Sequence, residues 1–260
     1  DKIKLHQFKQ EYYPLLVEIS DKPKWSCLED TIAVVDYINV EKNIVHAISS
    51  DNKEVFFPLE NLSLIKGDFI SAKKLQKKVR EEIRIDLKNI TKVNKEDVLN
   101  NFISHLAVID SINIEKQLFH YVVNNRIHGV IRFEETELRP IEGEFIQLKL
   151  VHKLDKKLNK LMFKAIEIKQ TEETTTTLRK DISGLLKLKF KQYGSTIDWD
   201  DLDWEDENNL TPSFGFIGDY YVSKELIDNS SIYTNCDVDA KVVFNGEKWK
   251  VYELKKKNSL

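Results

Sequence analysis

Apolar and polar residues alternate in short runs along most of the chain, and polar turns separate the runs. Residues 31–38 are rich in β-branched side chains, a polar turn follows at 39–43, and a second apolar run occupies 44–49. Turn signals recur roughly every 8–12 residues, a spacing typical of a small barrel or sandwich rather than of alternating strands and helices. The pattern therefore predicts an all-β fold.

The chain contains an internal repeat. Residues 33–46 read AVVDYINVEKNIVH and residues 107–120 read AVIDSINIEKQLFH, and eight positions are identical when Ala107 is aligned with Ala33. Further on, residues 65–70 (IKGDFI) correspond to residues 141–146 (IEGEFI) at a slightly larger offset. Two matches in the same order indicate a duplicated module of about 70 residues, with the length difference placed in a loop.

Each copy is predicted to hold five strands, which is the size of an OB-type Greek-key barrel. A polar segment, TEETTTT at 171–177, is typical of a linker, and a third run of strand patterns follows it. The predicted fold is three tandem five-stranded OB-type barrels after a short N-terminal segment. The expected boundaries are 1–29 (a cap or the end of an upstream domain), 30–97, 98–170, 171–179 (linker) and 180–260 (an acidic third barrel).

Residues 213–223, SFGFIGDYYVS, resemble the paired motifs of the cold-shock domain family. That family has an aromatic-Gly-aromatic-Ile strand, then a short turn into a Val-aromatic-Val-His strand. Alternation along a strand places Phe214 and Phe216 on one face, and Tyr221 can join them from the next strand. The segment GLLKLKF at 184–190 also resembles the opening strand of the family, with Lys187 and Lys189 outermost. The resemblance implies binding of single-stranded nucleic acid, RNA before DNA, with bases stacked on the three rings.

The first two modules are similar to the same family, but they hold fewer aromatic residues. The nearest ring candidates are Phe56 in the first copy and Phe133 in the second. His46 and His120 occupy equivalent places in the repeat, and histidine can stack on a base or donate a hydrogen bond to it. The alternative is that each histidine packs at a strand edge, and the sequence leaves both open.

Basic residues gather around the predicted long hairpins of the two copies. Such a cluster could follow a phosphate backbone; as an ordinary alternative, it is the solvated tip of two strands. The candidate phosphate contacts are Lys74, Lys77, Lys78 and Arg80 in the first copy, Lys153, Lys156 and Lys157 in the second, and Lys187 and Lys189 in the third.

The third module carries an acidic insertion, DWDDLDWEDE at 198–207. It is either a solvated loop or a contact segment, because indole rings between acids are typical of an amphipathic contact. As a contact segment it would dock a basic partner protein, or fold over the aromatic rings of its own module and compete with nucleic acid. The protein-interaction candidates are Trp199, Trp204, Asp200 and Asp203.

No motif for catalysis or for a resident cofactor is present. The sequence lacks a GxxxxGK[ST] loop, a GxGxxG turn, a GxSxG elbow and an HExxH pair, and its two cysteines and six histidines show no metal-ligand spacing. We expect no cofactor, no metal, no membrane segment, a cytoplasmic location and no enzyme in this segment. Since the chain does not begin with methionine, an enzyme could lie upstream or in a partner.

A net charge of −3, from 40 basic and 43 acidic residues, keeps a second function open. OB barrels also serve as docking modules for proteins. The alternative is therefore a protein-interaction scaffold of a larger bacterial complex.

Overall fold

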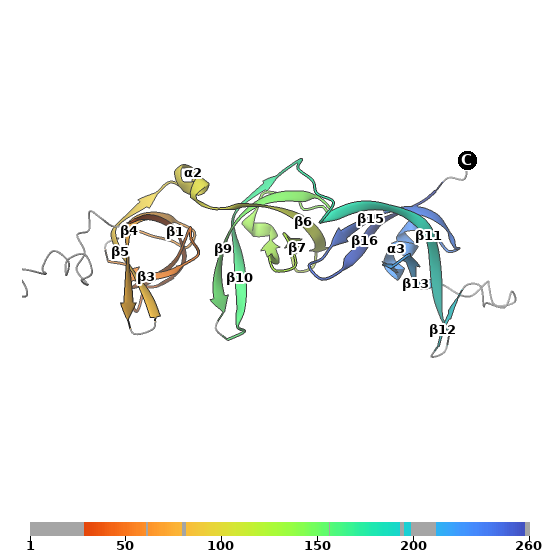
Figure 1. The fold of residues 1–260 in the computed structure, drawn as a ribbon, viewed down its shortest axis with the longest axis horizontal. Helices are drawn as coiled ribbons and strands as arrows, with labels where there is room; N and C mark the ends of the chain where they lie inside the picture. Colours follow the sequence, from red (N-terminus) through yellow and green to blue (C-terminus); the bar gives the residue numbers. More distant parts are fainter. Residues whose placement is uncertain are drawn as a thin grey trace, which may run out of the picture. The chain divides into compact units, whose positions relative to one another are not determined.

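A computed structural model describes residues 29–60, 62–79, 82–155, 157–192, 195–198 and 212–257, without the side chains of 76–84 and 191–198. Three antiparallel sheets follow one another along these residues (Figure 1). The first contains β1 (Glu29–Asn39), β2 (Ile44–Ser49), β3 (Glu54–Pro58), β4 (Phe69–Val79) and β5 (Glu82–Val93). The second contains β6 (Ser104–Asn113), β7 (Leu118–Val122), β8 (His128–Arg132), β9 (Phe145–Asp155) and β10 (Lys160–Gln170). The third contains β11 (Arg179–Gln192), β12 (Ser195–Asp198), β13 (Pro212–Ile217), β14 (Tyr220–Ser223), β15 (Cys236–Phe244) and β16 (Trp249–Lys256).

The three sheets share one strand order, with the first strand of each module in the centre. The orders are β3-β2-β1-β4-β5, β10-β9-β6-β7-β8 and β14-β13-β11-β15-β16, and β12 pairs with the end of β11. The prediction of an all-β chain with three five-stranded units is confirmed. Short helices complete the described part: α2 (Lys95–Val98), η2 (Leu99–Asn101), η3 (Phe133–Glu135) and α3 (Lys224–Ser230).

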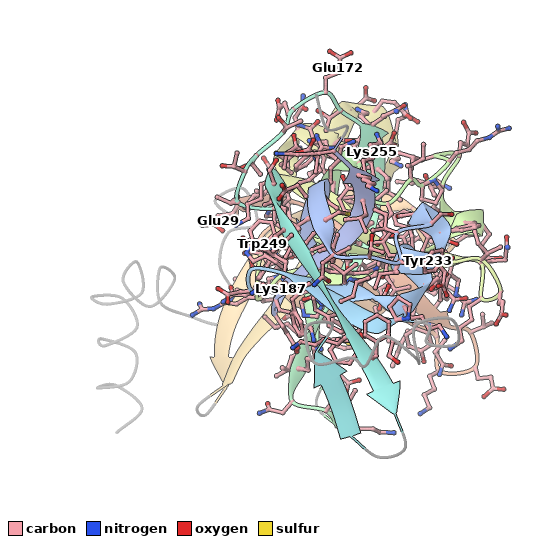
Figure 2. The ribbon with its side chains drawn as sticks, turned by 90° about the vertical axis from the view of Figure 1, so that its right-hand side faces the viewer. Glu29, Glu172, Lys187, Tyr233, Trp249 and Lys255 are labelled. Carbon is pink, nitrogen blue, oxygen red and sulfur yellow. The ribbon has the colours of Figure 1, made fainter. Side chains whose placement is uncertain are left out.

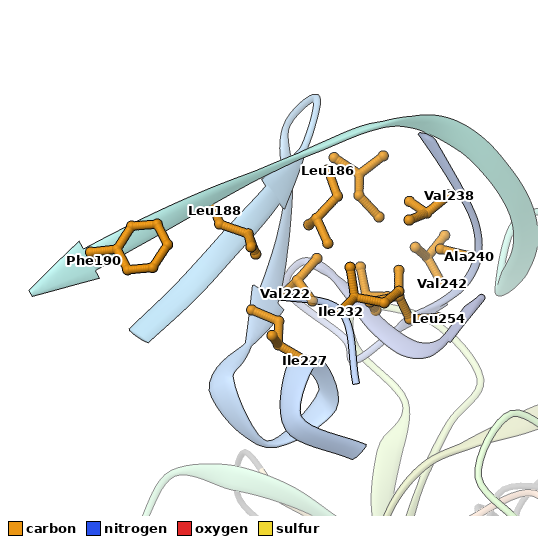
Figure 3. Packing of buried hydrophobic residues seen from close by; sticks show 12 residues of the cluster. Leu186, Leu188, Phe190, Val222, Ile227, Ile232, Val238, Ala240, Val242 and Leu254 are labelled. Atoms are coloured by element: carbon orange, nitrogen blue, oxygen red, sulfur yellow. The ribbon is translucent and has the colours of Figure 1, made fainter. Parts of the chain in front are cut away.

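The core of the third barrel forms because side chains of β11 alternate between its two faces. Leu186, Leu188 and Phe190 point inward and are almost completely buried (Figure 3). Helix α3, which the sequence pattern did not predict, adds the buried Ile227 to the same cluster. The helix begins directly after β14 because the Ser223 hydroxyl accepts a hydrogen bond from the Leu226 amide, as an N-cap does.

The first two barrels fill one equivalent core site in different ways. In the first, Ala47 lies opposite Val55; in the second, Tyr121 lies opposite Gly129. Tyr121 is 1% exposed, and a Cβ atom at Gly129 would lie 2.8 Å from its hydroxyl oxygen. That hydroxyl has no hydrogen-bond partner among the described residues, and burial raises its pKa. The tyrosine ring therefore fits only because the facing residue has no side chain.

The described chain divides into two compact units, and the first joins the first barrel to part of the second sheet. It comprises residues up to 103 together with 149–166, the long part of the β9–β10 hairpin. Val151 of β9 is buried against Val34 and Ile48, on the outer face of the first barrel. The Lys149 ammonium donates to the Leu99 carbonyl at 2.8 Å. The hairpin of one barrel is thus docked on the preceding barrel.

The second unit, 104–148 with 167 onward, repeats this arrangement. Val108 and Val122, the repeat equivalents of Val34 and Ile48, are buried in one cluster with Val243 of β15. Beside the cluster, the Lys250 ammonium lies 2.6 Å from a Glu142 carboxylate oxygen. In each unit, one outer face of a barrel is therefore packed against strands that follow later in the chain.

Candidate nucleic-acid interface

Strand β13 presents two phenylalanine rings on the outer face of the third barrel. Its side chains alternate, with Gly215 and Ile217 buried and Phe214 and Phe216 half-buried. A Cβ atom at Gly215 would lie 2.9 Å from the Leu186 side chain and 3.1 Å from a backbone oxygen, so glycine is needed for the strand to lie this close to β11. The predicted alternation is therefore present in the structure.

Tyr221 of β14 completes a cluster of three rings. It lies opposite Phe216 in the strand register and is 47% exposed. The ring centroids are 5.7 Å apart for Phe214 and Phe216, and 5.8 Å from each of them to Tyr221. These separations are within the range of aromatic contacts, so the rings support one another while part of each stays accessible.

Two lysines of β11 lie directly beside this ring cluster. Lys187 is opposite Phe216, and Lys189 is opposite Phe214. Lys187 is exposed, and Figure 2 shows it on the long strand that crosses the third barrel. Cations next to accessible rings are the combination that binds a single strand, because the rings stack on bases and the ammonium groups contact phosphates. The opening strand and the two aromatic motifs are thus brought together as the sequence predicted.

Strand registers identify the equivalent positions in the other two barrels. The first barrel has His46 and Phe56 paired across β2 and β3, with Ile44 in the place of Phe214. The second barrel has His120 paired with Val130, with Leu118 in the place of Phe214. Phe133, the ring expected there, lies in η3 after the strand, 6.4 Å from the buried Phe119 ring. In the second barrel, aliphatic side chains therefore occupy two of the three positions that carry rings in the third, and His120 occupies the position of Phe216.

The two repeated histidines are held by hydrogen bonds inside the protein. His46 is 5% exposed; its Nδ1 lies 3.2 Å from Asp36 Oδ2 and its Nε2 lies 3.0 Å from Glu54 Oε2. The ring of Phe56, which is 58% exposed, covers it at a centroid distance of 4.7 Å. Both nitrogens of His46 are thus engaged, and of these two stacked rings it is Phe56 that remains accessible.

His120 has the equivalent contacts in the second copy. Its Nδ1 lies 2.5 Å from Asp110 Oδ1, and its Nε2 lies 3.2 Å from His128 Nδ1. Asp110 and His128 are the repeat equivalents of Asp36 and Glu54, so the whole hydrogen-bonded chain is duplicated, with one carboxylate changed to imidazole.

Asp36 is the centre of the polar network of the first unit. It lies at a β-bulge between Val35 and Tyr37, and it is 7% exposed. Besides His46, its carboxylate accepts from the ammonium groups of Lys153 at 2.6 Å and Lys164 at 3.4 Å. The hydrogen bond from His46 holds the pKa of the Asp36 carboxyl well below its usual 3.8, and Lys153 and Lys164 act in the same direction while burial opposes them.

We predict an acid-sensitive first unit as a consequence. A lowered folded-state pKa stabilises the fold fully above the unfolded value near 4, and this contribution is lost as the pH falls below it. Asp36→Asn should lower the free energy of unfolding at pH 7 by about 2 kcal/mol, the usual size of a hydrogen bond to a charged group. It should also weaken the fall in stability between about pH 5 and pH 3. Urea unfolding at several pH values measures both effects. The exposed Glu41→Gln is the control, and equal pH profiles for Asp36→Asn and wild type would contradict the prediction.

The predicted lysine hairpins are only partly accessible to a ligand. Lys74 is 8% exposed, and its ammonium lies 3.0 Å from Asp51 and 3.5 Å from Glu29. Lys153 is paired with Asp36, and Lys157 is exposed in the turn after β9. The side chains of Lys77, Lys78, Arg80, Lys156, Trp199, Asp200, Asp203 and Trp204 lie outside the described residues, so their expected roles stay predictions. The acidic insertion begins beside the ring cluster, since the register places Asp198 opposite Lys189.

One candidate residue was not found from the sequence. Tyr37 of β1 is 49% exposed and lies opposite His46 of β2. The bulge at Asp36 sets which face of the strand Tyr37 takes. Strand alternation counted from the sequence gives no sign of a bulge, so the accessible face of this ring could not be predicted.

The second module is similar in sequence to a known domain family. Residues 99–161 match the family described as S1/CSD-like domain 1 of the TOTE conflict systems. This match covers the second module, and the strand order that its sheet shares with the other two gives the three modules one topology. Among solved structures, "drosophila Unr CSD456" is similar at 11% identity with a TM-score of 0.26, over 88% of this chain and 98% of that one. No curated protein matches the chain in sequence.

The described residues contain neither a metal-binding cluster nor a membrane-spanning helix. No three histidine, cysteine, aspartate or glutamate side chains in this part of the chain are grouped to hold a metal ion. None of its helices has the length and apolar character needed to span a bilayer.

Proposed function

We propose that the chain binds single-stranded nucleic acid, RNA in preference to DNA, through the outer face of the third cold-shock-like barrel and without catalysis. The observation that carries the proposal is the cluster of Phe214, Phe216 and Tyr221 beside Lys187. The cold-shock-like fold and the family match support nucleic-acid binding in general. The preference for RNA rests on the resemblance of residues 213–223 to the cold-shock motifs.

A salt series tests the proposal directly. Binding that depends on phosphate contacts weakens as salt rises, with a logarithmic slope near −0.7 per contact for single strands. For these two lysines alone, Lys187 and Lys189, we expect a slope of about −1.4 for a uridine oligonucleotide, and weaker binding of the matching deoxythymidine oligonucleotide. Fluorescence anisotropy measures both. Complete absence of binding at low salt would refute the function, whereas equal affinity for the two oligonucleotides would remove only the RNA preference.

One observation favours a second function, protein docking, for the second barrel. Its positions equivalent to the ring cluster carry Leu118 and Val130, and Val130 is 52% exposed. Ile114, in the adjoining turn, is 66% exposed. An exposed aliphatic patch offers no π face to a base but is typical of contacts between proteins. The two functions can therefore be divided between barrels of one chain.

A further inference from the structure

The first barrel carries a row of three side chains across its strands β1, β2 and β3. The equivalent row of the third barrel is Lys187, Phe216 and Tyr221. Tyr37 on β1, His46 on β2 and Phe56 on β3 lie opposite one another in the register. The two outer rings are 49% and 58% exposed, while the histidine between them is buried. Two accessible aromatic rings therefore stand on either side of a histidine that is fixed by hydrogen bonds.

Two cations reach the edge of this row from a different barrel. Lys153 of β9 and Lys164 of β10 both contact the carboxylate of Asp36, the neighbour of Tyr37 in the chain. The hairpin that carries them is anchored on the same face by the buried Val151. Its two lysine side chains are 41% and 32% exposed, so part of each is accessible to solvent.

These ion pairs fix the positions of the two ammonium groups but do not use all of their N–H donors. An ammonium group has three N–H donors. Among the described residues, Lys153 and Lys164 share one carboxylate, which leaves donors on both for an anion that approaches from solvent. The nearby Glu54 carboxylate lies on the other side of His46 and contacts the His46 Nε2.

The second barrel has neither the rings nor the cations of this arrangement. Ser111 replaces Tyr37 and Val130 replaces Phe56 in the register. Within the described residues, the carboxylate of Asp110 contacts His120 but no lysine, while Lys250 is directed to the Asp110 backbone oxygen. Accessible rings and lysine side chains are therefore found together in the first barrel and not in the second, although a later hairpin packs on both barrels.

We propose that Tyr37, Phe56, Lys153 and Lys164 form a second binding site for single-stranded nucleic acid, built by two barrels together. Bases stack on the two rings, and a phosphate accepts hydrogen bonds from the two ammonium groups, which Asp36 holds in position. The second barrel, which has Ser111 and Val130 in the places of Tyr37 and Phe56, contributes to binding through its hairpin. This inference rests on the proposed function of the third barrel and extends it to a longer stretch of the ligand.

The test uses the full chain and a labelled uridine oligonucleotide of about 12 nucleotides, within the range that an OB barrel covers. Phe214→Ala with Phe216→Ala first disables the ring cluster of the third barrel. In that background, Lys153→Gln with Lys164→Gln should lower the residual affinity about 10-fold and reduce the salt slope by about 1.4, the value for two lost contacts. Tyr37→Ala should lower it by about 5-fold or more, because one stacked base is lost.

Controls separate the site from charge and folding effects. Lys66→Gln with Lys160→Gln removes two exposed lysines and should change the affinity less than about twofold, because neither contacts Asp36. Lys153→Arg with Lys164→Arg keeps both charges and should retain most of the binding. Equal losses for the test pair and the control pair would overturn the second site, as would full affinity after Tyr37→Ala.

The outcomes also distinguish this inference from the function on which it rests. If the chain with a disabled third barrel binds nothing while wild type binds, the second site is refuted and the third barrel stands as the binding module. If wild type itself fails to bind, the proposed function is refuted as well.

Discussion

Replacing Phe214 and Phe216 by alanine should lower the affinity for a single-stranded oligonucleotide about 100-fold. Each base stacked on a ring contributes roughly 1–3 kcal/mol, and about 1.4 kcal/mol per ring already gives this factor. Both rings are half-buried on the outer face rather than inside the core, so their removal should leave the fold intact. Anisotropy titrations at one fixed salt concentration measure the change.

A pair of tyrosine substitutions at the same two positions is the matched control. Phe214→Tyr with Phe216→Tyr keeps the π faces and should retain affinity to within a few-fold. Circular dichroism and thermal unfolding of each variant establish that the barrel is folded. An alanine variant that folds and binds like wild type would show that these rings do not contact the ligand.

The second large effect is expected in the core of the second barrel, at Tyr121 and Gly129. Tyr121→Ala removes a fully buried ring and should cost about 3–5 kcal/mol of unfolding free energy. Gly129→Val should cost about 2–3 kcal/mol, because its side chain overlaps the tyrosine hydroxyl. The double variant rebuilds the Ala–Val pair that the first barrel has, so its cost should be smaller than the sum of the two by about 1–3 kcal/mol.

Urea unfolding of the four proteins gives this coupling energy. Tyr121→Phe is the control, because it removes only the hydroxyl that lacks a partner among the described residues and should leave stability unchanged or slightly raised. Strict additivity of the two single substitutions would show that the pairs in the two barrels are not interchangeable.

Local alternation made much of the third barrel predictable. The inward positions of β11 and β13 are apolar or glycine, and the outward ones are Lys187, Lys189, Phe214 and Phe216, so a period of two places each side chain correctly. The alignment of the two repeat copies likewise assigned His46 and His120 to one equivalent position. Such features depend on neighbouring residues and can be found in a single sequence.

The remaining features depend on contacts between distant residues. Lys153 meets the carboxylate of Asp36, far earlier in the chain, and no local pattern indicates that partner. The sequence favoured Phe133 as the ring of the second barrel because it does not show where β8 ends, and Val130 holds the position opposite His120 instead. The face of Tyr37 follows from a bulge whose position is set by the neighbouring strand.

The docking of each hairpin on the preceding barrel also bears on how the chain is made. During synthesis, the residues of the first barrel leave the ribosome before the hairpin that covers Val34 and Ile48. Phe69, Val98, Leu99 and Phe102 pack in the same patch and are made earlier, but the part that Val151 covers stays uncovered until residues 149–166 have emerged. The same delay recurs for the part of the Val108 and Val122 cluster that Val243 covers. At two stages of translation, the incomplete chain therefore has uncovered apolar surface to which chaperones can bind.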